Sequence, residues 1–315
     1  MHLFRYLSDF KVRDKKVALA IGNFDGFHKG HRAVIDAMLK KAREENLYSA
    51  VMIFEPQPLE FFGKAPPARL YSLRDKLKAF ASCGIDFVFC LRFDRSLAEL
   101  DAFDFVNEIL SKKINVASVT VGSLFTFGNG GVAGLDELKS YCAKANIKAE
   151  AIVGVASDNT RISSTLIRAL IEQSDFAEAY NMLGRHYSIS GRVVHGNAIG
   201  RTIGFPTANV NLNRLVCPLK GVFAVMVKTE YGLFKGMANI GLRPTIYEHK
   251  VKNLLEVNIF NFNFDLYGKH IEVIFIKKVR DEQKFPDLTS LMAQIKADQK
   301  SVSYMLENFN LDNLS

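Results

Sequence analysis

Two histidines and three glycines follow a short apolar stretch near the start of the chain. Residues 17–21 predict a buried strand and residues 33–43 predict a helix, because their apolar side chains have the corresponding spacings. Glycine at such a junction lets a ligand approach the backbone, and the unpaired N–H groups of a helix start favour a phosphate. His28 and His31 lie three residues apart and can face one side of that helix start. For these two residues alone, a tight turn with surface histidines is the simpler alternative.

A second stretch with anion-binding chemistry reads Arg-Ile-Ser-Ser-Thr-Leu-Ile-Arg at residues 161–168. Ser163, Ser164 or Thr165 can cap a helix, and the exposed amides and hydroxyls together form an anion site. Arg168 follows one turn later, within reach of a phosphate oxygen. An ordinary helix cap followed by a surface arginine is the alternative for this segment.

Glycines spaced by four residues precede a Pro-Thr-Ala-Asn run in the second half of the chain. Gly196, Gly200 and Gly204 can form a flexible flap over phosphates, although the pattern is neither a P-loop nor a dinucleotide fingerprint. A hairpin rich in glycine and proline would explain the glycines, but it does not require the run at residues 206–209.

The elements that must position these residues change character along the chain. Up to about residue 183, short apolar runs alternate with helical stretches, which predicts a parallel sheet covered by helices. In such sheets, ligands bind beyond the carboxyl ends of the strands. The expected strands span 17–21, 50–54, 87–91, 116–121 and 149–153, and further helices are expected at 74–82 and 102–110.

Beyond residue 184, strand-like runs dominate and a helical pattern returns only at 288–308. This order predicts a small antiparallel β-barrel closed by one helix. We place the domain boundary at residues 183–187. The expected strands span 187–194, 222–227, 233–240, 254–260 and 271–277.

Composition narrows the possible partners. The chain has 315 residues, 48% of them hydrophobic, and a net charge of +8. The basic residues are spread along the chain without a stripe of interleaved aromatics, so we expect small anionic substrates and no nucleic acid. Residues 1–16 lack an apolar signal core, and no apolar run approaches the ~20 residues that span a bilayer. We therefore expect a cytoplasmic protein with no membrane partner.

The motifs, in this order, resemble those of the prokaryotic bifunctional riboflavin kinase/FAD synthetase family. The run F-D-G-x-H-x-G-H at 24–31 resembles the nucleotidyltransferase signature, and G-R-T-I-G-F-P-T-A-N at 200–209 resembles the riboflavin kinase signature. The stretch 236–245 is also close to the kinase pattern. The resemblance implies a Rossmann-like FMN adenylyltransferase domain at 1–183 and a riboflavin kinase domain at 184–315. Riboflavin would be phosphorylated to FMN with ATP and Mg²⁺, and FMN would then be adenylylated to FAD with release of pyrophosphate.

The resemblance also implies residue roles. Glu256 would be the catalytic base of the kinase, on the strand face that period two gives it with Asn258, and Thr207 and Asn209 would bind Mg²⁺. His28 and His31 would be the catalytic residues of adenylyl transfer. The residues implied to bind ATP or its phosphates are Gly22, Phe24, Asp25, Gly30, Ser163, Ser164, Thr165, Arg168, Gly196, Gly200, Arg201 and Gly204. Those implied to bind flavin are Phe125, Asn239, Arg243, Arg280 and Phe285.

Three positions depart from the family pattern. Leu124 stands where an amide or a carboxylate is usual, Gly131 where a basic residue is common, and Asn258 where histidine is usual. The first two lie in the run 121–131 after the fourth expected strand, where we expect the nucleotide and flavin pocket. Leucine cannot form a hydrogen bond there, so the adenylyl-transfer site is where the resemblance is weakest.

Two other classes of function stay open at this point. The chain can be a riboflavin kinase whose N-terminal domain only binds or regulates, and would then make FMN but never FAD. It can also be a basic nucleic-acid-binding protein, whose affinity would fall steeply with salt. No RNA- or DNA-binding motif in the sequence supports the second alternative.

Overall fold

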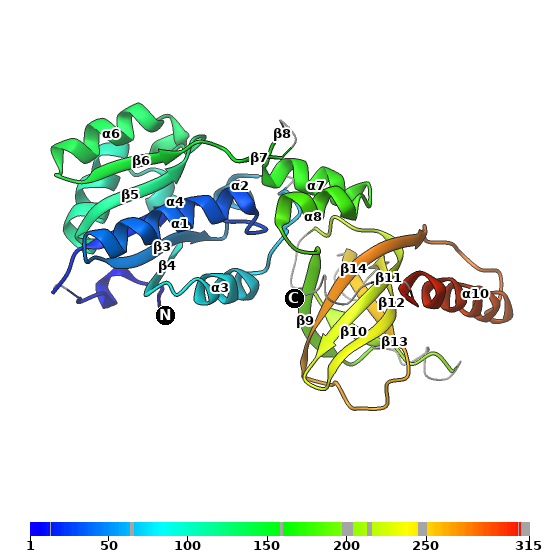
Figure 1. The fold of residues 1–315 in the computed structure, drawn as a ribbon. Coiled ribbons are helices and arrows are strands. Elements are labelled where there is room, and N and C mark those ends of the chain that lie inside the picture. Colours follow the sequence, from blue (N-terminus) through cyan, green and yellow to red (C-terminus); the bar gives the residue numbers. More distant parts are fainter. Residues whose placement is uncertain are drawn as a thin grey trace. The chain divides into compact units, whose positions relative to one another are not determined.

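The computed structural model describes residues 1–315 apart from 13, 64–65, 158–159, 197–203, 213–215, 245–250, 308 and 310–315. It divides into two compact units. The first comprises Met1–Pro67 and Leu73–Ser164, and the second Ala68–Ser72 and Thr165–Ser315. Figure 1 shows a layered α/β fold in the first unit and a β-barrel in the second, so the predicted fold class is confirmed.

The first unit is built on a six-stranded parallel sheet with the order β1-β4-β3-β2-β5-β6. Its central strand β2 is buried along its whole length, as its continuous apolar run requires. The short edge strand β1 has no counterpart among the predicted strands. The strands are β1 (His2–Phe4), β2 (Val17–Ile21), β3 (Tyr48–Glu55), β4 (Phe87–Arg92), β5 (Val116–Gly122) and β6 (Lys148–Ile152).

Apolar helices cover both faces of this sheet. Alternate residues of β2 enter different cores, because successive side chains of a strand point to opposite faces. Ala18 and Ala20 pack with α1 and α3, whereas Leu19 and Ile21 pack with the segment after α5 and with α6. The helices of this unit are α1 (Lys29–Glu44), α2 (Pro58–Phe62), α3 (Leu73–Ser82), α4 (Arg95–Ala98), α5 (Ala102–Asp104), η3 (Asn129–Gly131), α6 (Leu135–Lys144) and the single turn η1 (Leu7–Asp9).

The helix predicted at 102–110 is longer than expected and is not a regular α-helix. After α5, the segment Phe105–Ile114 continues as a π-helix, η2, and ends at Asn115 in the left-handed conformation. Its buried side chains Phe105, Val106, Ile109 and Leu110 fit the expected apolar spacing. The spacing therefore identified the helix and its buried face, but not its hydrogen-bonding pattern.

The sheet reverses its direction of growth at β2. The chain runs from β2 outward through β3 to β4, and then returns to the other side of β2 with β5 and β6. The carboxyl ends of β2 and β5 therefore flank a topological switch point, where open α/β sheets bind ligands.

The second unit holds a closed six-stranded antiparallel barrel with the order β10-β13-β12-β11-β14-β9. All five predicted strands and the final helix are present. The sequence analysis missed β10, which carries Asn209, because its four residues show no apolar run. The strands are β9 (Ser188–Val194), β10 (Ala208–Asn211), β11 (Gly221–Thr229), β12 (Gly232–Pro244), β13 (Val251–Ile259) and β14 (His270–Arg280).

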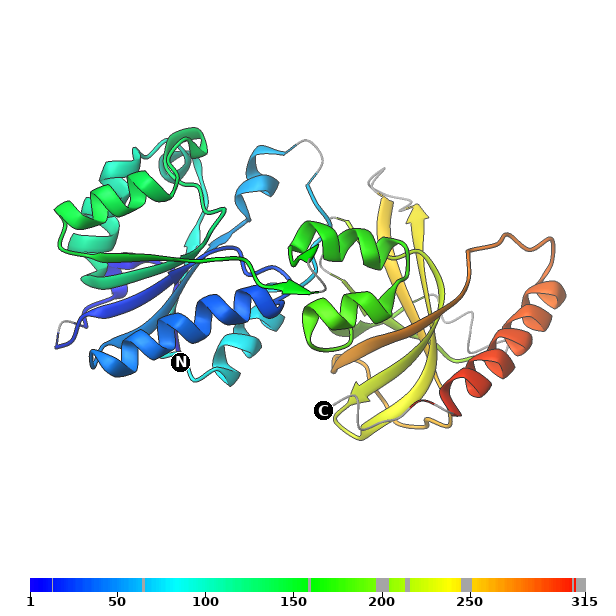
Figure 2. The same ribbon diagram turned by 45° about the horizontal axis from the view of Figure 1, so that its top comes forward.

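Helices cover this barrel at two places. Phe223 and Phe275 are buried, and the ring of Phe176 on α8 (Phe176–Leu183) lies 6.0 and 6.2 Å from them. The long helix α10 (Leu288–Glu307) lies beside the barrel strands (Figure 2). Its side chains Val302 and Leu306 pack with alternate residues of β11. Helix α7 (Ser164–Glu172) also belongs to this unit, except for its first residue, Ser164, which belongs to the first unit. The short strand pair β7 (Ala156–Ser157) and β8 (Thr160–Arg161) lies in the first unit.

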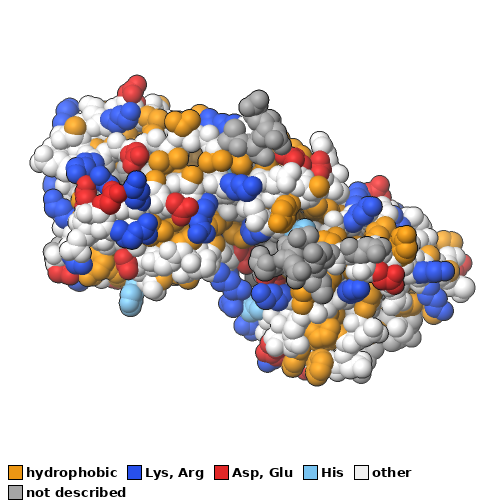
Figure 3. All heavy atoms as spheres, in the orientation of Figure 1, with side chains coloured by type: hydrophobic (Ala, Val, Ile, Leu, Met, Phe, Trp, Pro, Cys, Tyr) orange, Lys and Arg blue, Asp and Glu red, His pale blue; other side chains and the backbone are white. Residues whose placement is uncertain are grey.

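The charge distribution on the surface agrees with the sequence analysis where the structure describes it. On the face drawn in Figure 3, basic and acidic side chains are interspersed over the first unit and form no stripe. Within the described part of the chain, no helix is long and apolar enough to cross a membrane. The cysteines are free, and burial raises the pKa of the Cys142 thiol to about 12, which keeps it protonated.

Phe176 provides a test of how α8 stabilises the barrel. Its side chain is buried against two barrel aromatics, so Phe176→Ala should lower the free energy of unfolding of this unit by about 3–5 kcal/mol. Tyr304→Ala is a matched control, since Tyr304 lies in the same unit and is 72% exposed. Hydrogen exchange of the barrel amides measures both, and equal protection in the two variants would contradict the packing role of α8.

Candidate active sites

The loop after β2 places the start of α1 beside the carboxyl ends of the sheet strands. Phe24, Gly26 and Phe27 have φ angles of 47°, 82° and 43°, in a region that side chains other than glycine rarely adopt. The loop is held there by the buried Phe24 ring, which packs edge-on against Phe80 and His31. Backbone strain of this kind is concentrated at ligand sites.

His28 and His31 form one unit at the N-terminus of α1. His28 is the N-cap, and its Nδ1 accepts a hydrogen bond from the backbone N–H of His31 at 3.2 Å. The two rings stack with centroids 3.6 Å apart. Gly30 between them keeps the space beside His28 open, because a Cβ at this position would lie 3.1 Å from the His28 ring and crowd it. The stacking fixes both imidazoles beside the helix N-terminus, which attracts anions.

A cavity of about 250 Å³ opens beside these histidines. Residues at the carboxyl ends of β2, β5 and β6 line it, as expected at the switch point. The hydroxyl of Ser164, the last residue of the first unit, donates to the carbonyl oxygen of Asp25 in the loop after β2 at 2.9 Å. The predicted site residues that line the cavity are Gly22, Phe24, His28, Gly30, His31, Phe125, Ser163 and Ser164.

Asp25, Thr165 and Arg168 are not among the residues that line this cavity. Asp25 is 2% exposed and contributes its backbone carbonyl to the bond with Ser164. The Nε of Arg168 donates to the carbonyl oxygen of Ala68 at 2.6 Å. A phosphate contact for Thr165 and Arg168 therefore stays a prediction.

Arg161 is a cationic residue of this cavity that the sequence analysis did not select. It lies at the end of β8, lines the cavity, and donates from its guanidinium to the Ser123 hydroxyl at 3.0 Å. Leu124 lines the same cavity with its side chain 73% exposed, so the departure from the family pattern places an alkyl group beside polar ones. An arginine directly before a capping run was the available signal for Arg161.

The barrel carries a row of three polar residues on adjacent strands. Asn209 of β10 pairs with Glu256 of β13, and Glu256 pairs with Asn239 of β12. Residues directly opposite in a sheet project from the same face, so these side chains stand side by side. Leu255 and Val257 are fully buried on the other face of β13, so the predicted alternation of this strand is confirmed.

The row opens on a cavity of about 390 Å³ lined by the outer face of the barrel and by α10. Glu256 and Asn239 line it together with the predicted flavin-binding residues Arg280 and Phe285. The Oδ1 atom of Asn239 is buried, and it has no hydrogen-bond partner among the residues that the structure describes. A buried acceptor in this position is available to a group bound in the cavity.

A second cavity of the barrel, of about 500 Å³, shares the lining residue Thr207 with the cavity of about 390 Å³. Asn209 also lines this second cavity. Gly196 approaches Asn209 so closely that a Cβ there would collide with the side-chain amide. Tyr267 also lines this cavity, and its ring stacks on that of His195 with the centroids 3.9 Å apart. Thr207 thus lies between two spaces large enough for two substrates.

Asn258 links the two segments that carry the site. Its side chain is 7% exposed, and its Nδ2 donates to the carbonyl oxygen of Pro206 at 2.7 Å. This bond ties the strand of Glu256 to the residue directly before Thr207. The sequence analysis treated Asn258 only as a departure from histidine, because the contact joins residues 52 positions apart.

The remaining predicted residues lie within or next to internal segments that the structure does not fully describe. Gly200 and Arg201 lie outside the described residues. Gly204 has a φ of 81°, a conformation that favours glycine. Arg243 lies in β12, and its side chain is outside the described part of the structure.

Two protein-family models match this chain, one over the part that carries each candidate site. Residues 10–166 match the FAD synthetase family model, and residues 183–306 match the riboflavin kinase model. A solved structure named "Macrolide-efflux Protein", from Streptococcus pneumoniae, is similar over 98% of this chain and 99% of that chain, with a TM-score of 0.80 and 30% identity.

Curated relatives match over nearly their whole length. A bifunctional riboflavin kinase/FMN adenylyltransferase from Escherichia coli K12 is 45% identical, covering 89% of this chain and 90% of the relative. One from Haemophilus influenzae is 43% identical, covering 95% of this chain and 97% of the relative. The matches extend across both units and both sites, and the chain therefore belongs to the family of bifunctional riboflavin kinases/FMN adenylyltransferases.

Proposed function

We propose that the two activities of the family reside in separate sites of this chain, with a boundary at residues 183–187. The barrel, in residues 184–315, phosphorylates riboflavin to FMN with ATP. The sheet domain, in residues 1–183, adenylylates FMN to FAD and releases pyrophosphate. The observation that carries this proposal is the row Asn209–Glu256–Asn239, because it places a carboxylate beside a cavity that also contains Arg280 and Phe285.

In the kinase site, Glu256 is the general base. Riboflavin occupies the cavity beneath α10, and ATP occupies the larger cavity on the other side of Thr207. As the 5′-hydroxyl oxygen attacks the γ-phosphorus, its proton moves to the Glu256 carboxylate and ADP leaves. The fixed register of β10, β13 and β12 holds the base in position, which favours in-line attack.

Thr207 and Asn209 fit a magnesium site. Both offer the hard oxygen ligands that Mg²⁺ prefers, and the Oδ1 of Asn209 is buried with no hydrogen-bond partner among the described residues. When bound, Mg²⁺ would neutralise charge on the ATP phosphates. The chain's own contribution is to orient both oxygens, and Gly196 does so for Asn209 by its close approach.

In the adenylyl-transfer site, no side chain needs to act as a nucleophile. A phosphate oxygen of FMN attacks the α-phosphorus of ATP, and the bond to pyrophosphate breaks. His28, His31 and the N–H groups at the start of α1 hold the phosphates, and Arg161 adds a fixed positive charge across the cavity. Leu124 is not one of the groups that hold the phosphates. Its alkyl side chain therefore weakens binding but does not abolish transfer.

Chromatography of flavin products over time tests the whole proposal. With riboflavin and ATP, FMN should appear first and FAD should follow. Persistent FMN without FAD would instead support the alternative of a kinase with a non-catalytic N-terminal domain.

The substitution Glu256→Gln should lower FMN formation about 10²- to 10⁴-fold, because glutamine keeps the shape but cannot accept the proton. Conversion of supplied FMN to FAD should be unchanged. Glu230→Gln is the control, since Glu230 is a carboxylate of the same unit that pairs with Lys269 and lines neither barrel cavity. An equal loss of both reactions in a folded Glu256→Gln protein would remove Glu256 from this role.

The substitution His31→Ala should have the opposite effect. It removes one of the two stacked imidazoles, so FMN-to-FAD conversion should fall roughly 10²-fold while riboflavin phosphorylation stays normal. His2→Ala, on the exposed edge strand of the same unit, is the control. Unchanged FAD synthesis in His31→Ala would mean that the phosphates bind elsewhere.

The Asn258 contact predicts a selective effect on the kinase. Asn258→Ala leaves the Pro206 carbonyl without its donor and should reduce riboflavin phosphorylation by about 2- to 13-fold, the equivalent of one neutral hydrogen bond. Asn258→His should restore most of the rate, because an imidazole N–H can also donate. Assays of both reactions measure this, and a histidine variant as slow as the alanine variant would exclude the hydrogen bond as the cause.

A further inference from the structure

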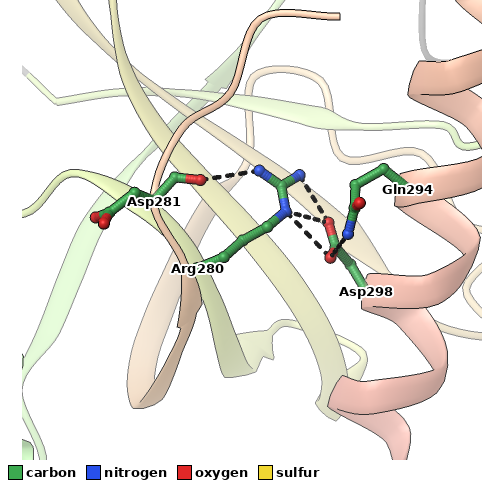
Figure 4. Close-up of polar contacts among 4 residues, drawn as sticks. All are labelled: Arg280, Asp281, Gln294 and Asp298. Carbon is green, nitrogen blue, oxygen red and sulfur yellow. Dashed lines mark hydrogen bonds and ion pairs between the residues drawn. The ribbon is translucent and has the colours of Figure 1, made fainter.

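Arg280, the last residue of β14, is held from two sides (Figure 4). Its Nε lies 3.1 and 2.9 Å from the two carboxylate oxygens of Asp298, and a terminal nitrogen lies 2.7 Å from one of them. The other terminal nitrogen donates to the backbone carbonyl of Asp281 at 2.9 Å. A fork-shaped contact of this kind fixes the plane of a guanidinium as well as its position.

Asp298 is itself held in place from within α10. Its side chain is only 4% exposed, and the Nε2 of Gln294, one helical turn earlier, donates to its Oδ1 at 2.8 Å. Both carboxylate oxygens are therefore engaged. A buried carboxylate with this many partners has one well-defined orientation.

The pair is part of the wall of a cavity. Arg280 and Asp298 line the same space as Glu256, and the guanidinium carbon of Arg280 lies 5.7 Å from the centre of the Phe285 ring. A guanidinium has five N–H groups, of which Asp298 and Asp281 occupy three. Within the described part of the chain, the other two form no hydrogen bond and remain as donors for a ligand.

We propose that Asp298, steadied by Gln294, is a positioning residue for riboflavin, acting through Arg280. It fixes the guanidinium so that the two remaining N–H groups meet acceptor oxygens of the flavin ring above Phe285. The inference rests on the proposed flavin site beneath α10. It makes α10 part of substrate recognition, beyond its apolar packing against β11.

The alternative is that the ion pair only attaches α10 to the barrel. A purely structural role would change the thermal midpoint and would affect riboflavin and ATP alike. A positioning role changes riboflavin binding selectively, at temperatures where every variant is folded. Riboflavin fluorescence quenching gives the Kd without catalysis, and steady-state FMN formation gives the KM for each substrate.

The full-length protein is used with Asp298→Asn, Arg280→Ala and the double variant, and with Glu307→Gln as the control. Glu307 is an exposed carboxylate on the same helix. Asp298→Asn should raise the Kd and KM for riboflavin about 10-fold or more, because it removes a charge-assisted contact that orients Arg280. The KM for ATP and the control should stay unchanged. In the double variant, the effect of Asp298→Asn should disappear, since it acts through Arg280.

A folded Asp298→Asn protein with normal riboflavin Kd would overturn the inference, as would equal shifts for riboflavin and ATP. If Arg280→Ala also binds riboflavin normally, the flavin assignment of the cavity fails with it. If Asp298→Asn does not fold, Gln294→Leu decides, because it leaves the ion pair and removes only the contact that orients it. A riboflavin Kd raised about 2- to 13-fold in Gln294→Leu supports the inference, and an unchanged Kd overturns it.

Discussion

The register between β10, β13 and β12 is the constraint on which the kinase site depends. Backbone hydrogen bonds across these strands place Asn209, Glu256 and Asn239 opposite one another. A shift of β13 by one residue would turn Glu256 to the other face, where Leu255 and Val257 are buried. Burial of these apolar neighbours therefore fixes the register, and the register in turn fixes the chemistry. Closure of the barrel removes the free edges at which such a shift could begin.

The first unit positions its site by a different physical means. Its central strand β2 is apolar throughout and supplies no polar side chain. Chemistry is instead placed in the loops that leave the carboxyl ends of the strands, where the sheet order reverses. The left-handed residues Phe24 and Phe27 and the stacked pair His28–His31 show how tightly the first of these loops is constrained. A rigid loop of this kind presents helix amides to an anion without a cost of reordering at the moment of binding.

The barrel unit places an ion pair and an amide side chain where they are largely shielded from solvent. Buried Asp298 and partly buried Arg280 pair beside Ile295 and Phe285 in the wall of one cavity. A buried ion pair stabilises a fold weakly, since desolvation offsets much of the attraction, but it orients its partners strongly. The same holds for Asn258, whose bond to Pro206 adds little stability and fixes two segments relative to each other.

The sequence by itself determined the family and the two fold classes, and it named many of the residues that line the candidate cavities. Strand and helix periodicities are local, and so are motifs such as residues 24–31, so they can be recognised without knowledge of the tertiary structure. It also located the departures at Leu124 and Asn258. Its errors were local as well: β1 and β10 are too short to show a pattern, and the π-helix Phe105–Ile114 keeps a helical apolar spacing.

Tertiary structure alone decided which residues meet. Asn258 and Pro206 are 52 residues apart, and Arg161 and Ser123 are 38 apart, so no local signal connects them. It also directed Arg168 to the carbonyl of Ala68, a partner 100 residues away that the cap-like run 161–168 does not indicate. Contacts of this kind depend on strand order, register and helix docking. Strand order, register and helix docking are determined by burial of the whole core. A sequence motif shows only which residue types the site requires.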